Sequence, residues 1–365
     1  MRILQDEKLD FNDVLLVPQR STLISRKDVI LERSFRFYHS PKTWSGTPII
    51  CSNMYNTGSL AMAKALKEWR MITCLHKYHS IEQLVSVLSR ECDDNSYIWP
   101  SIGFKDADIT KLKMLREGLN NGFNICIDVP NGHLEVFVDF CAKVRNEFPE
   151  SIIMAGNVTT PEMTQELIIH GGVDIIKTQI GPGSMCKTRM VTGVGYGSLS
   201  CVIECSGAAH GLKNGEKKLG LICSDGGCRE TGDINKAFGG GADFVMLGGM
   251  FAGYEENDGE WKEKDTYTFE GSLWDGQHIA TRKKYLKFYG MSTHHAQQQH
   301  GNGIKTYRAS EGDVREIECK GKVDDGIQEM LGGIRSCCTY IGANSIKDMN
   351  KCAVFAKISR IHTKF

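Results

Sequence analysis

The chain has 365 residues, and its 44 Lys and Arg balance 44 Asp and Glu, so the formal net charge is zero. Hydrophobic residues make up 41% and charged residues 24%, which excludes a disordered or fibrous chain. The charge balance makes nucleic acid a poor default partner, and no apolar run approaches the roughly 18 residues that span a membrane.

Eight short apolar segments recur along the chain, each followed by a longer amphipathic stretch. They are nearly continuous rather than alternating, as in parallel strands buried on both faces. These segments cover 47–53, 70–76, 97–103, 123–129, 151–157, 173–180, 219–225 and 242–248. Helical patterns between them include 59–69, 80–92, 133–148 and 160–171. The repeat predicts an α/β fold, a (β/α)8 TIM barrel; a doubly wound sheet is the alternative, but it usually has fewer strands.

We expect a single catalytic domain over residues 1–365, with residues 1–46 as an N-terminal extension. Two segments break the repeat. The Gly-rich segment 181–198 follows the sixth strand, and the polar segment 254–322 follows the eighth. The second is therefore expected to form an insertion and flap over the C-terminal face, where barrel active sites lie. A helical pattern at 324–342 closes the ring.

The fourteen cysteines indicate a reducing, cytoplasmic location. They are too dilute for a disulfide scaffold, and Cys51, Cys74, Cys126 and Cys223 lie in apolar runs where a thiol acts as a small hydrophobe. The N-terminal residues include acidic side chains where a signal peptide would have its apolar core. No cysteine and histidine spacing predicts a zinc site.

The strongest chemical signal is the sequence GPGSMCKTR at 181–189. Cys186 lies on a loop directly after a strand, where Lys187 and Arg189 are expected to favour its thiolate. Thr188 is placed to move a proton. A tight turn with an incidental cysteine is the alternative interpretation.

Two further loops follow the seventh and eighth strands. The segments 224–227 and 247–249 have the Gly content of a barrel phosphate site, and Asp225 is well placed for sugar hydroxyls. Ordinary turns are the alternative. Asp128 is interpreted as a helix N-cap, and Lys177 as the Schiff-base candidate of an aldolase-like enzyme. The histidines at 294, 295 and 300 are interpreted as solvated surface.

The sequences GPGSMCKTR, SDGGC, AFGGGADFVMLGGMFAG, FYGMS, YRASEG and LGGIRSCCTYIGA together resemble GMP reductases, the sibling family of IMP dehydrogenases. DFNDVLLVP and CSNM also fit, so the resemblance covers nearly the whole chain. Three features favour the reductase. The connection after the second strand is too short for a CBS module pair, YRASEG has the reductase form, and FYGMS replaces the YRGMGS of dehydrogenases. The flap also lacks the Arg-Tyr pair with which a dehydrogenase activates water.

The resemblance implies the reaction GMP + NADPH → IMP + ammonia + NADP+, a step of purine salvage. Cys186 would attack C2 of the purine and expel ammonia to leave a covalent thioimidate, which hydride would then discharge. Thr188 and Glu311 would protonate the leaving ammonia. A reductase must exclude water from this thioimidate until hydride arrives.

The resemblance also implies binding residues and a homotetramer. The GMP phosphate would contact Ser184, Gly248 and Gly249, the ribose Asp225, Gly226 and Gly227, and the base Gly290, Met291, Ser292, Arg308, Ala309, Ser310 and Gly312. NADPH would contact Lys77, Asp128, Val129, Pro130, Ile180, Gly181, Met291, Tyr307, Arg308, Ser336, Cys337, Cys338 and Thr339, with Ser25 and Arg26 from a neighbouring subunit. Potassium would be held by the carbonyls of Gly181, Gly183, Cys186 and Arg189.

Several positions depart from the family pattern. Tyr55 replaces an aspartate, Lys187 replaces a small polar residue, and KTQIG at 177–181 replaces KVGVG. The segment 254–285 is longer than expected, and we predict that deleting roughly 259–276 leaves turnover largely intact. The competing functions are an IMP dehydrogenase without CBS modules and a non-catalytic purine-nucleotide-binding barrel.

Overall fold

The computed structural model describes residues 1, 3–90, 95–119, 121–270, 277–300, 307 and 309–359. Eight parallel strands form a closed barrel in the order β12-β13-β4-β5-β6-β7-β8-β9. They are β4 (Ile49–Cys51), β5 (Ile72–Leu75), β6 (Ile98–Ile102), β7 (Ile125–Asp128), β8 (Ile153–Val158), β9 (Ile175–Thr178), β12 (Leu221–Asp225) and β13 (Phe244–Leu247). Each coincides with one of the eight predicted segments, β8 running one residue further, so the barrel prediction is confirmed.

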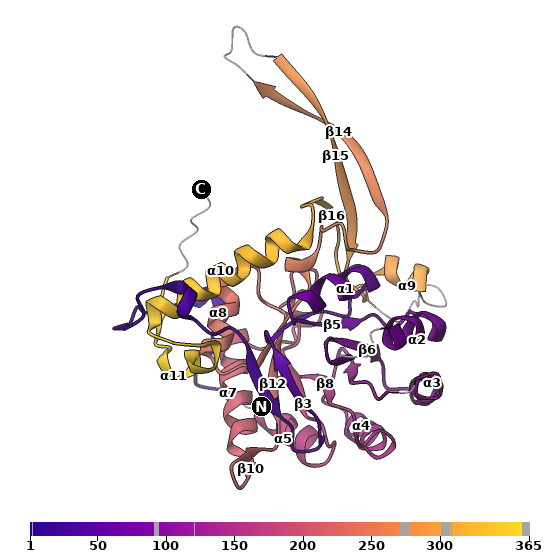
Figure 1. The fold of residues 1–365 in the computed structure, drawn as a ribbon, viewed down its shortest axis with the longest axis vertical. Coiled ribbons are helices and arrows are strands. Elements are labelled where there is room, and N and C mark those ends of the chain that lie inside the picture. Colours follow the sequence, from indigo (N-terminus) through magenta and orange to yellow (C-terminus); the bar gives the residue numbers. More distant parts are fainter. Residues whose placement is uncertain are drawn as a thin grey trace.

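Helices surround the barrel (Figure 1). They are α1 (Leu60–Glu68), α2 (Ile81–Arg90), α3 (Asp106–Glu117), α4 (Glu135–Glu147), α5 (Pro161–Ile169), α6 (Thr188–Thr192), α7 (Ser198–Gly211), α8 (Thr231–Gly239), α9 (His294–His300), α10 (Val323–Ile341) and α11 (Met349–Cys352). Thr160 caps α5, since its hydroxyl accepts the Met163 N–H and Pro161 takes the first helical position. Among the described residues, no helix is long and apolar enough to cross a membrane.

Short elements flank the barrel. Antiparallel pairs join β1 (Val14–Leu16) to β17 (Phe355–Lys357), β2 (Arg33–Arg36) to β3 (Thr43–Gly46), and β10 (Lys213–Asn214) to β11 (Lys217–Lys218). The 3-10 turns are η1 (Phe11–Asp13), η2 (Arg26–Asp28), η3 (Asn95–Tyr97), η4 (Gly249–Phe251) and η5 (Ile346–Asp348). The β2–β3 hairpin closes the end of the barrel where strands begin, because Phe35 and Trp44 pack on Phe244 with ring centroids 4.6 and 5.3 Å away. The opposite end stays available for a site.

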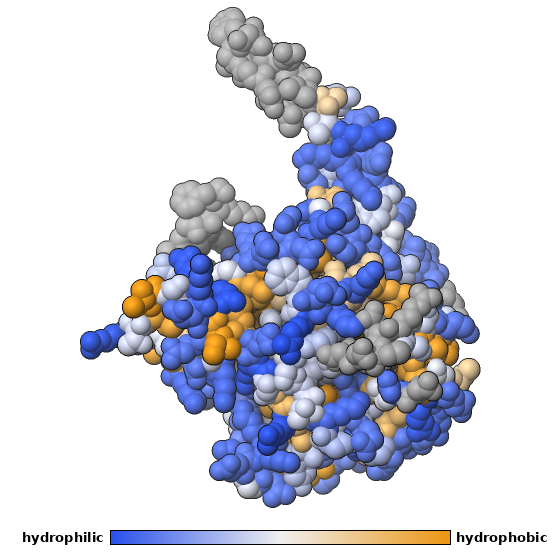
Figure 2. All heavy atoms as spheres, in the orientation of Figure 1, coloured by the Kyte–Doolittle hydropathy of each residue, from blue (hydrophilic) through white to orange (hydrophobic). Residues whose placement is uncertain are grey.

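Part of the polar segment 254–322 forms a long two-stranded arm. β14 (Trp261–Glu270) pairs with β15 (Gln277–Tyr289) from Trp261↔Leu286 out to Glu270↔Gln277, and β16 (Val314–Glu318) joins the base of β15. Figure 1 shows the arm projecting away from the barrel, and Figure 2 shows a mainly hydrophilic surface on its described part. Only its base belongs to the packed structure.

The arm base carries contacts that the predicted deletion of 259–276 would remove. That deletion takes away the whole of β14 and uncovers Leu286, which is buried. We expect it to lower the free energy of unfolding by about 1.5–3 kcal/mol. Replacing only residues 266–281 by Asn-Gly keeps the base paired, because Asp265 and Arg282 are register partners and the two-residue turn suits a hairpin.

This shorter arm should change kcat/KM by less than about twofold, as steady-state kinetics would show, because a solvated tip tolerates truncation. Thermal melts of the two deletions provide the comparison. Loss of turnover in the 266–281 replacement would mean that the outer arm takes part in the reaction.

Candidate active site

The cysteine loop pairs with a segment more than a hundred residues further along the chain. The Lys187 N–H donates to the Glu311 carbonyl at 2.7 Å, and the Asp313 N–H donates to the Met185 carbonyl at 2.9 Å. This two-way pairing places Cys186 opposite Gly312. Residues that the sequence predicts for one site, on the loop after β9 and near the end of the polar segment, therefore meet at the barrel mouth.

Three side chains form a proton path within this pairing. The Cys186 thiol donates to Thr188 Oγ1 at 3.2 Å, and the Thr188 hydroxyl donates to Glu311 Oε2 at 2.6 Å. Both Cys186 and Glu311 are half-buried. A proton can pass from the thiol through the hydroxyl to the carboxylate and back, which is what a nucleophile with a positioned acid and base requires.

The two cations near Cys186 do not serve its thiolate, contrary to expectation. Lys187 Nζ lies 3.0 Å from Asp313 Oδ1, and this hydrogen bond lowers the pKa of the Asp313 carboxyl. Arg189 binds both carboxylate oxygens of Asp10 at 2.8–3.1 Å. Each charge is compensated by a carboxylate from a distant part of the sequence, so the expected support for a thiolate is wrong for this geometry.

A buried lysine organises the carboxylates below the loop. Lys177 is fully buried, forms an ion pair with Asp128, and lies 3.2 Å from Asp225 Oδ2. Burial opposes its charge, but the two carboxylates raise the pKa of Lys177 well above its ordinary value. Lys177 therefore stays protonated in an ion pair. A Schiff-base nucleophile must be a neutral amine, so the aldolase-like interpretation is wrong. Asp128 is not an N-cap either, because α4 begins after Leu134.

Asp225, which is predicted to bind the ribose, belongs to the same network around Lys177. Asn157 Nδ2 donates to the same Asp225 Oδ2 at 2.9 Å, so both contacts use one oxygen, and no described residue contacts Oδ1. Sequence reasoning missed Asn157, since an asparagine within an apolar strand pattern gives no signal of its partner two strands away.

Three glycine-containing loops meet at the predicted phosphate end. A Cβ on Gly249 would lie 2.7 Å from Ser184 Oγ, and one on Gly226 would lie 3.4 Å from Pro182 Cγ. Gly226 and Gly227 have φ angles of +92° and +82°, in the left-handed region that favours glycine. Gly249 thus approaches Ser184 too closely for a larger residue, while the backbone conformation favours glycine at 226 and 227, as suits backbone recognition of an anion.

The predicted base-binding segment lies against the cysteine loop. The Gly290 N–H donates to the Asp313 carbonyl at 3.0 Å, and a Cβ on Gly290 would lie 3.0 Å from the Met185 carbonyl. Met291 and Ser292 follow it, while Ala309 and Ser310 lead into Glu311. Arg308 lies outside the described residues, and Tyr307 is exposed.

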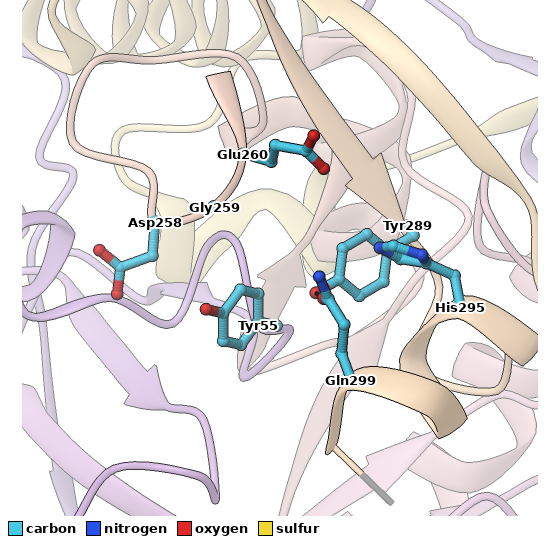
Figure 3. Close-up of a pocket in the computed structure, with 7 residues that line it drawn as sticks. All are labelled: Tyr55, Asp258, Gly259, Glu260, Tyr289, His295 and Gln299. Atoms are coloured by element: carbon cyan, nitrogen blue, oxygen red, sulfur yellow. Dashed lines mark hydrogen bonds between the residues drawn. The ribbon is translucent and has the colours of Figure 1, made fainter. Parts of the chain in front are cut away.

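An aromatic cluster joins α9 to the barrel beside this segment (Figure 3). The Tyr55 ring lies 4.3 Å from the His300 ring and 6.0 Å from the Tyr289 ring, and the Tyr55 N–H donates to Met291 Sδ at 3.4 Å. His295 packs on Tyr289 at 4.7 Å. The prediction of solvated surface is therefore wrong for His295 and His300, whose rings pack on aromatic faces. Of the three histidines, His294 alone is exposed.

His76, His79 and Asp258 also approach one another at the edge of this cluster. The two imidazoles stack face to face at 3.7 Å and 8°, so their nitrogens do not converge on one point. His76 Nδ1 accepts the Tyr78 N–H, and His79 Nε2 bonds the Gly58 carbonyl. Burial lowers the pKa of His76 to about 3 and also lowers that of His79, so the two imidazoles form a packed neutral stack.

The comparisons with known proteins agree with this geometry. The family model of the IMP dehydrogenase / GMP reductase domain matches residues 8–364. The chain belongs to the IMP dehydrogenase / GMP reductase family. It is 46% identical over 360 residues to a GMP reductase of Escherichia coli O81 (strain ED1a) and to one of Shigella boydii serotype 4 (strain Sb227). These alignments cover 98% of this chain and 97% of each relative.

One departure from the family pattern is a strained residue under the Ser224–Gly227 loop. Gln179 occupies a glycine position of KVGVG and has a φ angle of +85°, which costs an L-residue about 1–2 kcal/mol. Its amide nitrogen donates to Ser224 Oγ at 2.6 Å. Its Oε1 is buried beneath Gly227 and has no hydrogen-bond partner among the described residues. The side chain thus supports the loop that carries Asp225.

Replacing Gln179 by glycine separates these two effects. The variant relieves the backbone strain, so its melting temperature should not fall. The KM for GMP should rise about threefold to tenfold, because the loop loses a hydrogen bond worth about 0.5–1.5 kcal/mol. Gln179→Asn, which tolerates the same φ but does not reach Ser224, should raise KM similarly. An unchanged KM in both variants would show that Gln179 only fills space.

Proposed function

We propose that the chain is a GMP reductase that converts GMP to IMP and ammonia with NADPH. The path from Cys186 through Thr188 to Glu311 carries this proposal. It supplies a nucleophile and a proton donor side by side, and the chain's relatives bear the GMP reductase name. The same family contains dehydrogenases, so the reaction is assigned by the site and the relatives together.

The residues perform the first half of the reaction as follows. The Cys186 thiol loses its proton through Thr188 to Glu311, and the sulfur bonds to C2 of GMP. The bond from C2 to the amino nitrogen then breaks as the same proton returns through Thr188 to the leaving group. Ammonia departs, and a neutral thioimidate remains on Cys186.

In the second half, hydride replaces the sulfur. The bound nicotinamide cofactor supplies the hydride to C2. The C2–S bond then breaks, IMP leaves, and a solvent proton restores the thiol. Residues 311–313 lie against the cysteine loop, and this cover shields the thioimidate from water until hydride arrives.

The residues predicted to bind NADPH fit one cofactor molecule if they come from two neighbouring subunits. Lys77 and Asp128 lie at the barrel mouth, whereas η2, with Ser25 and Arg26, packs on α10, which carries 336–339. Figure 1 places the β5–α2 connection and the far end of α10 toward opposite sides of the molecule. We therefore propose that the second group reaches the cofactor from a neighbouring subunit, in a homotetramer.

The cysteine loop also fits a potassium ion. In the described structure the carbonyl oxygens of Gly181 and Cys186 accept no hydrogen bond, while that of Gly183 accepts the Cys186 N–H at 2.9 Å. These oxygens, with the carbonyl of Arg189, would hold the ion and fix the loop that carries the nucleophile. We further propose that the enzyme works in a reducing cytoplasm, where the Cys186 thiol is not oxidised to a disulfide. Its role there would be in purine salvage.

The test follows the loss of NADPH absorbance on adding GMP, with IMP and ammonia measured in parallel. We expect equal amounts of NADP+, IMP and ammonia from GMP, and no XMP from IMP and NAD+. Formation of XMP would instead assign a dehydrogenase. GMP binding without any NADPH oxidation would assign a non-catalytic nucleotide-binding barrel.

A further inference from the structure

A cavity begins at the predicted phosphate end of the site and continues beyond it. Its volume is about 510 Å³, within the range of about 300–1,000 Å³ typical of small-molecule sites. Ser184 and Gly249, the residues expected to hold the GMP phosphate, form one end of its wall. The wall then continues over the start of α8, the base of the arm and the side of α10, so the space exceeds what one phosphate group fills.

Two cations in this wall have no carboxylate partner among the residues that the structure describes. Arg229, at the start of α8, is exposed and forms no ion pair. Lys320, after β16, places its Nζ 5.1 Å from the Tyr254 ring, and burial lowers the pKa of its ammonium group. An anion between these two side chains would compensate both charges and return the Lys320 pKa toward its ordinary value.

The α8 helix adds a third favourable group on the same wall. Thr231, its first residue, lines the cavity, and the side chain of the N-cap residue Glu230 makes no capping hydrogen bond. The first backbone N–H groups of this nine-residue helix and its positive end thus favour an anion there.

Carboxylates that line the same cavity weaken its attraction for an anion. Glu316 is already bound by Lys264, and Arg315 by Asp313. Among the described residues Glu329 forms no ion pair; burial, and then the charge of Glu329, raise the pKa of Tyr254. Glu329 and the exposed N-cap residue Glu230 are therefore the groups that oppose an anion, whereas Asp233 in the first turn of α8 is paired with Lys236.

We propose that this cavity holds the second phosphate of guanosine diphosphate, whose nucleoside and first phosphate occupy the GMP site. The inference rests on the proposed function for the identity of the nucleoside. The β-phosphate would lie between Arg229, Lys320 and the first turn of α8. Guanosine diphosphate then competes with GMP, and the site responds to the ratio of the two nucleotides.

The test compares the inhibition constant of GDP with the KM for GMP in four single variants. Arg229→Ala and Lys320→Ala should each raise the inhibition constant about tenfold to a hundredfold, since each loses a hydrogen bond to a charged group, while KM for GMP stays within about twofold. Glu329→Gln should lower the inhibition constant. Arg282→Ala, on the exposed arm, should change neither. An equal effect on GMP and GDP, or no effect on either, would overturn the proposal.

Direct binding separates this inference from the proposed function. Calorimetric titration of the full-length protein with GDP, in the presence and absence of GMP, does not depend on turnover. Displacement of GDP by GMP, with weaker GDP binding in Arg229→Ala, would support the second-phosphate site even if NADPH were not oxidised. Failure of GDP to bind a protein that turns over GMP would refute the site and leave the reductase assignment intact.

Discussion

Cys186→Ala is expected to abolish turnover while GMP still binds. Its sulfur is the only atom in the proposed path that forms a bond to the purine, so the loss in kcat should be about 10⁴-fold or more. Thr188 and Glu311 keep their hydrogen bond of 2.6 Å without it, so the pocket should stay assembled. The measurement is kcat from NADPH oxidation together with GMP affinity from calorimetry.

Cys352→Ala is the matched control for this variant. Cys352 is a half-buried thiol on α11, away in sequence from the loops that form the site, and among the described residues it donates a hydrogen bond to the Gly342 carbonyl alone. Its replacement should leave kcat unchanged. Substantial turnover by Cys186→Ala would contradict covalent catalysis, and an inactive Cys352→Ala would show that thiol loss perturbs the barrel in general.

Lys177→Met is expected to be the most destabilising single substitution discussed. It leaves the Asp128 and Asp225 carboxylates without their shared cation, and breaking a buried pair in this way costs about 3–5 kcal/mol of unfolding free energy. The lower end applies, since the Asp128 side chain is 38% exposed. Urea denaturation at neutral pH measures the loss. Lys187→Met, which breaks a more exposed pair with Asp313, should cost less than about 1 kcal/mol.

The effect of Lys177→Met should also depend on pH. In the wild type burial opposes the charge of Asp128, but Lys177 lowers the pKa of Asp128 below its ordinary value. The pair therefore contributes stability above the unfolded pKa, and this contribution disappears as pH falls through the folded pKa. The difference between variant and wild type should begin to shrink near pH 4, where about half of unfolded Asp is protonated, and should shrink further as the pH falls below it. A difference that stays constant with pH would show that Lys177 acts by packing alone.

The barrel could be predicted because each buried strand is a run of apolar residues, and the pattern is local. The arm could not be predicted in the same way. Its sequence from Trp261 onward is largely polar on both faces, because both faces of the projecting ribbon meet water. A strand without a buried face carries no alternation that a sequence reader can detect.

The sequence predicts which residues lie at the candidate site, because their position follows from the barrel fold. It does not predict which side chains they pair with. Residues at the C-terminal end of a barrel strand, such as Asp225 in β12, must lie at one face, and Cys186 on the loop after β9 lies there too. The interpretations of Lys187, Arg189 and Asp128 failed because their partners come from distant segments. Asp10 and Asp313 compensate the two cations, and Lys177 claims Asp128. The role of Tyr55 likewise could not be predicted, because its ring packs on side chains from distant segments: His76, Tyr289 and His300.

The most direct test of the account is the intact mass of the protein after incubation with IMP and NADP+ in the absence of ammonia. Run backward, the proposed chemistry moves hydride from C2 of IMP to NADP+ and leaves the purine on Cys186, with no ammonia to release it. We predict a stoichiometric nucleotide adduct on the peptide that contains Cys186, and its disappearance with formation of GMP when ammonia is added. Release of XMP, or an adduct that maps to another cysteine, would contradict the account.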